Sequence, residues 1–339
     1  MPLRKVQTFG LPRMEKASIK NMKRLRLGVV GVGYLGSLHA QKYAALEGID
    51  LVGLTDRDYP RAQAVAGKYN TKAYRSHEEL LPHVDGVSLA VPTVSHFEIG
   101  RDILDQGIHL LVEKPITLTL EDAEGLITLA KERSVILQTG HIERFNPVVM
   151  EMESLISQPL FIESHRLNPY TKRGTDVDVV LDLMIHDLDI ILHFVDSEIA
   201  RIDAIGMPAV SGKTDFAHAT IQFANDTRAN VTASRVSTES VRTIRIFQPD
   251  SYISADYKNR RIGVTRFEVQ GANGTDLPKV AHREDEFQGS DPLADQIRSF
   301  VESIRNCTEP RVTGVDGKKA LSVALSIIEQ IQKKGETLR

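Results

Sequence analysis

A run of acidic and histidine side chains recurs at helical spacing in the otherwise apolar segment 178–193. With about 100° of turn per residue, these side chains fall within one arc of about 80°. They are Asp178, Asp182, His186, Asp189 and His193. A carboxylate four residues before an imidazole can fix the imidazole tautomer and favour its protonated form. Asp182 and His186 therefore predict a general base on a helix face that lines a ligand site.

Two alternatives to this interpretation stay open. A polar stripe can simply face water, although such stripes usually include Lys, Glu or Gln, and here only Asp187 is expected to point away from the stripe. Asp182, His186 and His193 could also bind a metal ion, but no Cys or further His cluster completes a ligand shell. We therefore expect no metal, and no motif supports a Ser or Cys nucleophile.

A glycine-rich turn supplies a second candidate site. The apolar run 25–30 leads into Gly31, Gly33 and Gly36, with Tyr34 and Leu35 inside the turn, and a helical pattern follows. The first glycine permits a tight turn, the second lets the backbone approach a pyrophosphate, and the third lets the helix pack against the strand. This context predicts a dinucleotide site at a helix N-terminus, with a purely structural turn as the alternative.

The next expected strand ends at Asp56, twenty residues after Gly36. At this spacing an acid accepts hydrogen bonds from the adenosine ribose and repels a 2′-phosphate, which favours NAD over NADP. Arg57 follows directly and could receive such a phosphate, so NADP remains the less favoured alternative.

Two further strand ends carry polar groups that belong to the same predicted crevice. They are Glu113 and Lys114 after the run 109–113, and Pro92, Thr93 and His96 after the run 86–91. Ligands of open α/β sheets gather outside the carboxyl ends of the strands, so we predict that these residues contact the cofactor. A solvated surface lysine and an early-helix histidine are the alternatives for Lys114 and His96.

The first half of the chain alternates apolar, β-branched runs with helical patterns. The runs occupy residues 25–30, 51–55, 86–91, 109–113 and 135–139. Continuous apolar runs of this kind suit a parallel sheet that is covered on both faces. Residues 25–144 are thus predicted to form an N-terminal Rossmann domain, doubly wound around a parallel sheet.

The second half changes rhythm after Pro147. Expected strands occupy residues 160–166, 200–206, 216–223, 228–235, 243–248 and 262–270, and expected helices occupy 182–194, 292–306 and 317–333. Strands this close along the chain pair antiparallel. Residues 145–339 are therefore predicted to form a C-terminal α+β domain with a mainly antiparallel open sheet, so the whole chain is of the α/β class.

Charge is distributed unevenly over the 339 residues. Residues 1–26 carry eight Lys or Arg and one acid, which leaves −10 on the remainder of a chain whose formal net charge is −3. The acidic body argues against a nucleic-acid interface, and residues 1–24 are expected to be a poorly ordered basic extension. One cysteine and no long apolar run indicate a cytoplasmic protein without a membrane span.

Taken in order, these motifs resemble the glucose–fructose oxidoreductase, inositol dehydrogenase and MocA-like (Gfo/Idh/MocA) family. The resemblance spans about residues 25–333 and rests on the glycine turn, Glu113-Lys114-Pro115, the segment 140–147, Asp182 with His186, and the closing segment 309–317. It implies a nicotinamide-binding first domain, a second domain whose open sheet serves in oligomer contacts, and redox chemistry on a carbon of a sugar or cyclitol. A homo-oligomer, dimer or tetramer, is the corresponding expectation.

The resemblance also implies roles for individual residues. His186 would take the hydroxyl proton, Asp182 would orient His186 or relay that proton, and Lys114 would hydrogen-bond the reacting oxygen. This assignment is chemically consistent, because negative charge develops on the oxygen as hydride leaves carbon. Glu113 would hold the lysine or contact the cofactor.

Within the family, segments 141–147 and 181–187 are similar to nucleotide-sugar 3-dehydrogenases. These enzymes oxidise the 3-hydroxyl of UDP-N-acetylglucosamine or a relative to a 3-keto sugar for a partner aminotransferase, in lipid A or polysaccharide biosynthesis. Residues expected to bind such a substrate are Arg144, Asn146, Arg166, Tyr170 and Arg173. Ordinary loop charge is the alternative for these cations.

Two other functions stay open: oxidation of a free sugar or inositol, and a non-catalytic nicotinamide-binding regulator. One departure from the family pattern bears on the substrate. Asp176-Val-Asp178-Val stands where many members have a glycine pair, which puts the shape of the substrate pocket in doubt.

Overall fold

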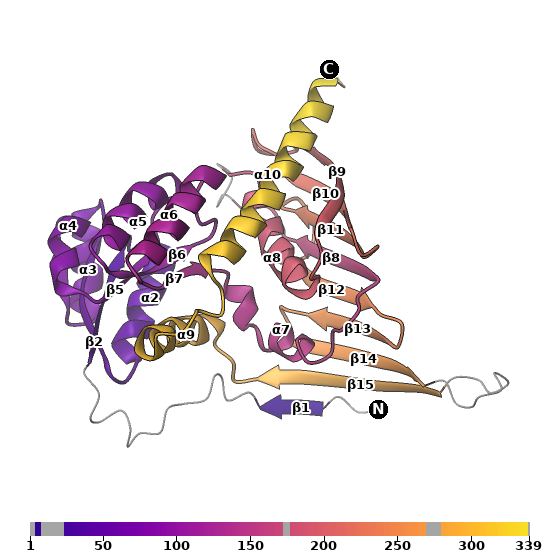
Figure 1. Ribbon diagram of the computed structural model, residues 1–339, viewed down its shortest axis with the longest axis horizontal. Coiled ribbons are helices and arrows are strands. Elements are labelled where there is room, and N and C mark those ends of the chain that lie inside the picture. Colours follow the sequence, from indigo (N-terminus) through magenta and orange to yellow (C-terminus); the bar gives the residue numbers. More distant parts are fainter. Residues whose placement is uncertain (1–3, 8–23, 172–176, 269–278, 338–339) are drawn as a thin grey trace. The chain divides into compact units, whose positions relative to one another are not determined.

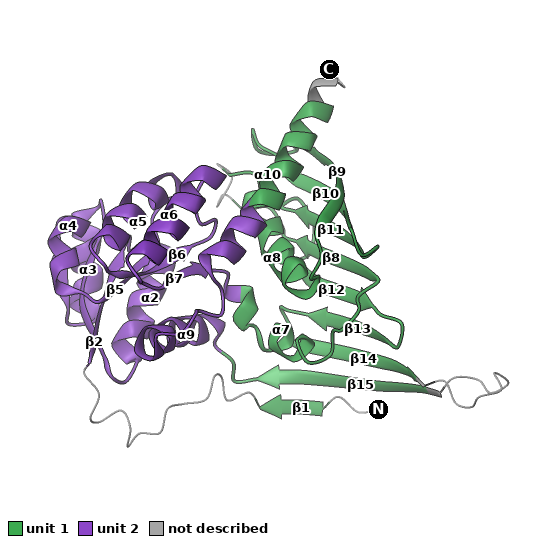
Figure 2. Ribbon diagram, viewed as in Figure 1, with its two compact units in different colours: residues 1–9, 143–290, 322–339 green, residues 10–142, 291–321 purple. Residues whose placement is uncertain are grey.

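The computed structural model describes residues 4–7, 24–171, 177–268 and 279–337. The chain forms two compact units, drawn in green and purple in Figure 2. Unit 1 comprises residues 1–9, 143–290 and 322–339, and unit 2 comprises residues 10–142 and 291–321. Figure 1 labels the elements described below.

Unit 2 is built on a parallel sheet that has six strands within the described residues, in the order β4-β3-β2-β5-β6-β7. The strands are β2 (Leu25–Val30), β3 (Ile49–Thr55), β4 (Lys72–Tyr74), β5 (Gly86–Leu89), β6 (His109–Glu113) and β7 (Leu137–Gly140). The chain leaves β2 toward β3 and β4 and then returns to the other side of β2 as β5, β6 and β7. The carboxyl ends of β2 and β5 thus flank the switch point where open α/β sheets bind ligands.

Helices flank this sheet in unit 2 (Figure 1). They are α2 (Tyr34–Ala45), α3 (Tyr59–Lys68), α4 (His77–Leu80), α5 (His96–Asp105), α6 (Leu120–Glu132) and α9 (Pro292–Asn306). The sequence assigns α9 to the second domain, but Ile297 and Phe300 of α9 belong to the buried core around Leu27 of β2. Burial of this apolar helix face groups α9 with unit 2.

Unit 1 contains a second sheet, mainly antiparallel, whose order over the described residues is β1-β15-β14-β13-β12-β8-β11-β10-β9. Its strands are β1 (Arg4–Gln7), β8 (Phe161–Leu167), β9 (Ile199–Met207), β10 (Phe216–Phe223), β11 (Arg228–Ser234), β12 (Val241–Phe247), β13 (Ser251–Asp256), β14 (Arg261–Glu268) and β15 (Lys279–Gln288). Only β1 with β15 and β8 with β11 pair parallel among these described strands. The predicted fold class is confirmed.

The remaining α-helices are α7 (Pro147–Met152), α8 (Ile185–Phe194) and α10 (Gly314–Thr337). The first turns of α10 belong to unit 2, and its later turns belong to unit 1. Residues of β10 alternate between buried and half-buried, so one face of the larger sheet carries the core of unit 1. The buried positions of β10 are Ala217, Ala219, Ile221 and Phe223.

Three strands of the larger sheet, β1, β13 and β15, are absent from the sequence prediction. Arg4–Gln7, expected to be poorly ordered, form β1 along β15, with Arg4 Nε 3.6 Å from a carboxylate oxygen of Asp285. The sequence does not predict β13 and β15, because polar residues interrupt the apolar alternation that marks a strand. β15, for example, reads Lys-Val-Ala-His-Arg-Glu-Asp-Glu-Phe-Gln. In β15 the buried Asp285 is paired with Arg283 at 3.1 Å, which makes its burial tolerable.

The glycine turn yields a stability prediction. A β-carbon on Gly36 would lie 1.8 Å from the Gly31 carbonyl oxygen, whereas one on Gly33 would meet nothing within 4 Å. Gly36→Ala is therefore expected to lower the free energy of unfolding by about 1–3 kcal/mol or more, because the backbone must shift. Gly33→Ala, the matched control, is expected to stay within about 0.5 kcal/mol of the wild type. Urea unfolding of both variants tests this, and equal stabilities would contradict it.

Candidate active site

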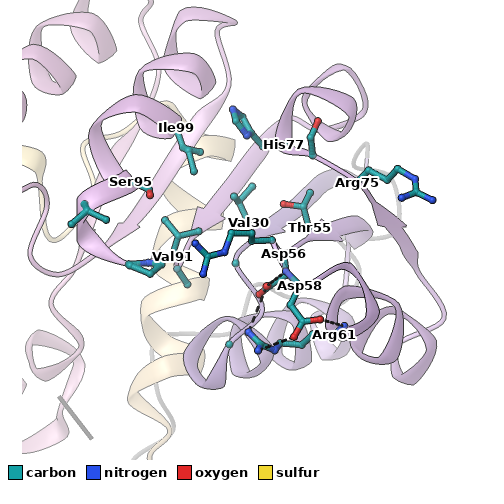
Figure 3. A pocket seen from close by; sticks show the side chains of 17 residues that line it. Val30, Thr55, Asp56, Asp58, Arg61, Arg75, His77, Val91, Ser95 and Ile99 are labelled. Carbon is teal, nitrogen blue, oxygen red and sulfur yellow. Dashed lines mark hydrogen bonds and ion pairs between the residues drawn. The ribbon is translucent and has the colours of Figure 1, made fainter. Parts of the chain in front are cut away.

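A cavity of about 800 Å³ opens at the carboxyl ends of the strands of unit 2 (Figure 3). Its wall comprises the glycine turn, the end of β3 with the residues after it, and the segment after β5. Predicted cofactor-binding residues in this wall are Gly31, Gly33, Asp56, Arg57 and Pro92. The structure therefore brings five of the predicted cofactor residues together in one wall.

The Asp56 carboxylate is fixed from both sides. One oxygen accepts a hydrogen bond from the Val32 backbone N–H at 2.8 Å, and the other accepts one from the Asp58 backbone N–H at 2.8 Å. Arg61 Nη1 lies 3.5 Å from a carboxylate oxygen of Asp56, and Figure 3 marks the interactions of these side chains with dashed lines. The carboxylate keeps further lone pairs for ribose hydroxyls, so its position suits the predicted contact.

The turn itself presents backbone to the cavity. Gly31 adopts a φ of 85°, which favours glycine, and Gly33 precedes α2 without a side-chain cap. The open space around Gly33 and the helix N-terminus behind it fit the pyrophosphate of a dinucleotide. Tyr34 is 73% exposed, and Leu35 is half-buried.

Several predicted cofactor residues lie beside this cavity rather than among the residues that line it. His96 is buried, with Nδ1 3.0 Å from the Pro115 carbonyl oxygen and Nε2 3.0 Å from that of Val91, and burial lowers its pKa. Glu113 is also buried, and a carboxylate oxygen lies 3.0 Å from His39 Nε2. These two side chains fasten the segments after β5 and β6, so the structure indicates a supporting role for them.

Lys114 follows β6 directly and is half-buried. It stands between the anchored Glu113 and Pro115, whose carbonyl group contacts His96. Thr93 begins a short 3₁₀ turn, Thr93–Ser95. These contacts hold the chain on both sides of Lys114.

The polar helix differs from the continuous α-helix that the sequence predicted. Residues Val180–Met184 form a π-helical turn, and α8 begins only at Ile185. Asp182 still donates an α-type backbone bond to the Asp178 carbonyl at 3.0 Å, but the 100° spacing does not hold between Asp182 and His186, because a π turn bonds residue i to i+5. His186 and Asp182 are both half-buried, so neither lies in bulk solvent. π turns occur frequently at functional sites, which is consistent with the functional site that the sequence predicts on this helix.

The predicted substrate residues include three that the structure buries in unit 1. Arg166 is 2% exposed, and its guanidinium donates hydrogen bonds to Asp187 at 2.6 Å and Glu143 at 3.0 Å. Arg144 and Asn146 are 3% and 5% exposed. Because these side chains are committed to internal contacts, their predicted role in binding a diphosphate gains no support from the geometry. Tyr170 is 47% exposed, so substrate binding by Tyr170 stays a prediction. Arg173 lies outside the described residues.

Asp187 is the functional candidate that sequence reasoning missed. It was expected only to point away from the polar stripe, yet it is fully buried against Arg166. The signal was present in the alternation of β8, where Arg166 shares a buried face with Ile162 and Ser164. A buried arginine in a strand requires a buried acid elsewhere.

Two negative findings apply to the part of the chain that the structure describes. It contains no group of three or more His, Cys, Asp or Glu side chains arranged to hold a metal ion. None of its helices is both long and apolar enough to cross a membrane.

Comparison with known proteins extends these observations. The family model for "Oxidoreductase family, NAD-binding Rossmann fold" matches residues 25–141, and that for "GFO/IDH/MocA C-terminal domain" matches residues 148–275. The chain is 38% identical over 307 residues to UDP-N-acetylglucosamine 3-dehydrogenase of Acidithiobacillus ferrooxidans, covering 90% of this chain and 97% of that protein. It is 24% identical to myo-inositol 2-dehydrogenase of Thermotoga maritima, over 91% of this chain and 97% of that protein.

Solved structures agree with the sequence matches. The A. ferrooxidans enzyme superposes with a TM-score of 0.86 at 37% identity, over 92% of this chain and 99% of that one. The scyllo-inositol dehydrogenase of Lactobacillus casei, solved with NAD(H) and scyllo-inositol, shares the fold with a TM-score of 0.77 at 22% identity, over 92% and 98% of the two chains. This chain therefore belongs to the Gfo/Idh/MocA oxidoreductase family, and its first domain is an NAD-binding Rossmann domain.

Proposed function

We propose that this oxidoreductase uses NAD to oxidise the 3-hydroxyl of UDP-N-acetylglucosamine or a related UDP-amino sugar to a 3-keto sugar. The observation that carries the proposal is the 38% identity to the A. ferrooxidans UDP-N-acetylglucosamine 3-dehydrogenase, which extends over 97% of that enzyme. The cavity of unit 2, with Gly33 open to ligand and Asp56 held at its wall, supports the cofactor half of the reaction.

We propose that His186 and Lys114 act on the same hydroxyl. His186 takes the hydroxyl proton as the carbon–hydrogen bond breaks, and Asp182 orients the imidazole or passes the proton on. Lys114 donates a hydrogen bond to the oxygen, where negative charge develops. NAD, when bound, accepts the two electrons and the hydrogen from carbon, so the alcohol loses one hydride and one proton in total.

The acceptor NAD is favoured over NADP by the position of Asp56, whose carboxylate would face a 2′-phosphate. Arg57 in the same cavity wall keeps NADP as the less favoured cofactor. A 3-keto amino sugar is a carbonyl compound, so an aminotransferase is the class of enzyme that would consume it. Oxidation of inositol is the second candidate, supported by the 24% identity to the T. maritima myo-inositol enzyme.

The cofactor half of the proposal is tested at Gly33. Gly33→Ala is expected to raise the Kd of NAD at least about tenfold, because the added methyl group occupies the place where the pyrophosphate approaches the backbone. Gly67→Ala is the matched control, since its β-carbon also meets nothing within 4 Å and Gly67 does not line the cavity. Calorimetric titration measures both constants. Equal Kd values for the two variants would remove the proposed pyrophosphate contact.

The chemical half is tested at Lys114 and His186. With NAD and UDP-N-acetylglucosamine, the wild type should generate reduced-nicotinamide absorbance and a 3-keto product detectable by mass spectrometry. Lys114→Ala and His186→Ala should each lower kcat by about 10²–10⁴-fold, because each removes a group that acts in the transition state. The exposed Lys131 and His282 supply control variants, Lys131→Ala and His282→Ala, expected to keep wild-type rates.

Other substrates separate the two candidate functions. Turnover of myo-inositol together with no turnover across a panel of UDP-sugars would favour the second candidate. Wild-type activity in either alanine variant would contradict the assigned roles.

A further inference from the structure

We propose that Asp187, clamped by Arg166, is a positioning residue that sets the rotation of the helix carrying His186. This inference rests on the proposed function, in which His186 takes the hydroxyl proton. The clamp comprises Glu143, Arg166 and Asp187, which come from the short 3₁₀ turn Ile142–Phe145, from β8 and from α8.

The contacts of the clamp are direct and bidentate. Arg166 Nε and a terminal nitrogen donate to the two Asp187 carboxylate oxygens at 2.6 and 3.3 Å. The other terminal nitrogen donates to Glu143 at 3.0 Å, and Asn146 donates to the second Glu143 oxygen at 3.1 Å. A planar guanidinium bound in this way has one allowed orientation, so it fixes the direction of the Asp187 side chain.

Burial makes the clamp costly to break. The side chains of Arg166 and Asp187 are 2% and 1% exposed, and the guanidinium lies 5.9 Å from the ring centre of Tyr257. Burial raises the pKa of Glu143, but Arg166 and Asn146 more than offset this and hold it below its usual value. Glu143 is therefore charged at neutral pH and holds Arg166 in place. A movement of Asp187 away from Arg166 would leave the buried Asp187 carboxylate without this partner.

The contacts at the beginning of the helix lie far from His186. Asp178 accepts from the Val180 N–H through its side chain and from the Asp182 N–H through its carbonyl, both at 3.0 Å. The π turn Val180–Met184 lies between this cap and α8, so an anchor close to His186 is needed to fix the rotation of α8. Asp187 is the third residue of α8, directly after His186. A second, looser contact follows at Asp189, whose carboxylate lies 4.0 Å from Arg144 Nε.

The magnitude of the effect follows from helix geometry. Side-chain tips lie about 5–6 Å from the axis of a helix, so a rotation of about 10° moves the imidazole by about 1 Å. A displacement of about 1 Å in a reacting group can lower a rate by about 10²-fold. Holding Asp187 therefore holds His186 at the accuracy that proton transfer requires, although Asp187 itself contacts neither substrate nor cofactor in this proposal.

The test is Asp187→Asn in the full chain, with Asp196→Asn as the matched control, since Asp196 is exposed just beyond the end of α8. With NAD and UDP-N-acetylglucosamine, Asp187→Asn should lower kcat by about 10–100-fold. The KM values for both ligands should stay within about threefold, since an interaction with the base acts on kcat. A rise in KM at unchanged kcat, or wild-type kcat, would overturn the inference.

A second readout does not depend on turnover. The rate of acylation of His186 by diethylpyrocarbonate, followed by peptide mass spectrometry, should change at least about twofold in Asp187→Asn, while His218 on β10 and His282 on β15 react as in the wild type. An unchanged rate at His186 would also overturn the inference. If Asp187→Asn fails to fold, Arg166→Lys serves as the second variant, because it keeps the positive charge but cannot donate two parallel hydrogen bonds to Asp187. The kinetic constants and the acylation rate of His186 are then measured in Arg166→Lys.

The parallel variant His186→Ala separates this inference from the proposed function. Full activity in His186→Ala would refute the proposed role of the base, whatever Asp187→Asn does. Loss of activity in His186→Ala with wild-type kcat in Asp187→Asn would refute the positioning role alone.

Discussion

The close approach of two backbone segments at the glycine turn is the constraint on which the nucleotide site depends. The Gly31 N–H donates to the Thr55 carbonyl at 2.8 Å, and the Val32 N–H donates to Asp56 at 2.8 Å. These bonds join the end of β2 to the end of β3, so the turn and Asp56 cannot move independently. Because a side chain at Gly36 would collide with the Gly31 carbonyl, the helix can begin this near the strand only with glycine there.

Each unit also contains a buried polar network next to a predicted catalytic group. In unit 2, the His39 ring contacts Glu113 at 3.0 Å and Ser88 at 3.0 Å, and Tyr43 reaches the same serine at 2.6 Å. Unit 1 has the clamp around Arg166. Buried charges are tolerated only when their partners stay in place, so such networks favour one geometry over its neighbours more than they add stability.

Much of the fold was predictable because it follows from patterns along the chain. Apolar strands and the glycine spacing predicted the parallel sheet and the cavity, and the position of Asp56 followed from its distance to Gly36. The bounds of β10 and α9 agree with the sequence prediction because clear turn residues and Asp291, which accepts from the Ala294 N–H, delimit them. Local signals of this kind need no knowledge of tertiary contacts.

The parts that were not predictable depend on contacts between distant segments. A π turn has no signature in a 100° periodicity, so the register before Ile185 could not be inferred. The roles of Arg166 and Asp187 depend on a contact across 21 residues of sequence. A polar side chain alone does not reveal whether it faces a ligand or a buried partner, and the sequence gives no sign that Arg144, Asn146 and Arg166 are buried in unit 1.

The strand β1 has a consequence for how the larger sheet meets its surroundings. Residues Arg4–Gln7 pair in register with Asp285–Gln288, so β1 covers the outer side of this part of β15 and becomes the edge strand of the sheet. An open border would offer unsatisfied amide and carbonyl groups to any extended peptide, including a neighbouring molecule. A four-residue edge strand that carries Arg4 and Lys5 offers an extended peptide a shorter and more charged border than the ten residues of β15 would.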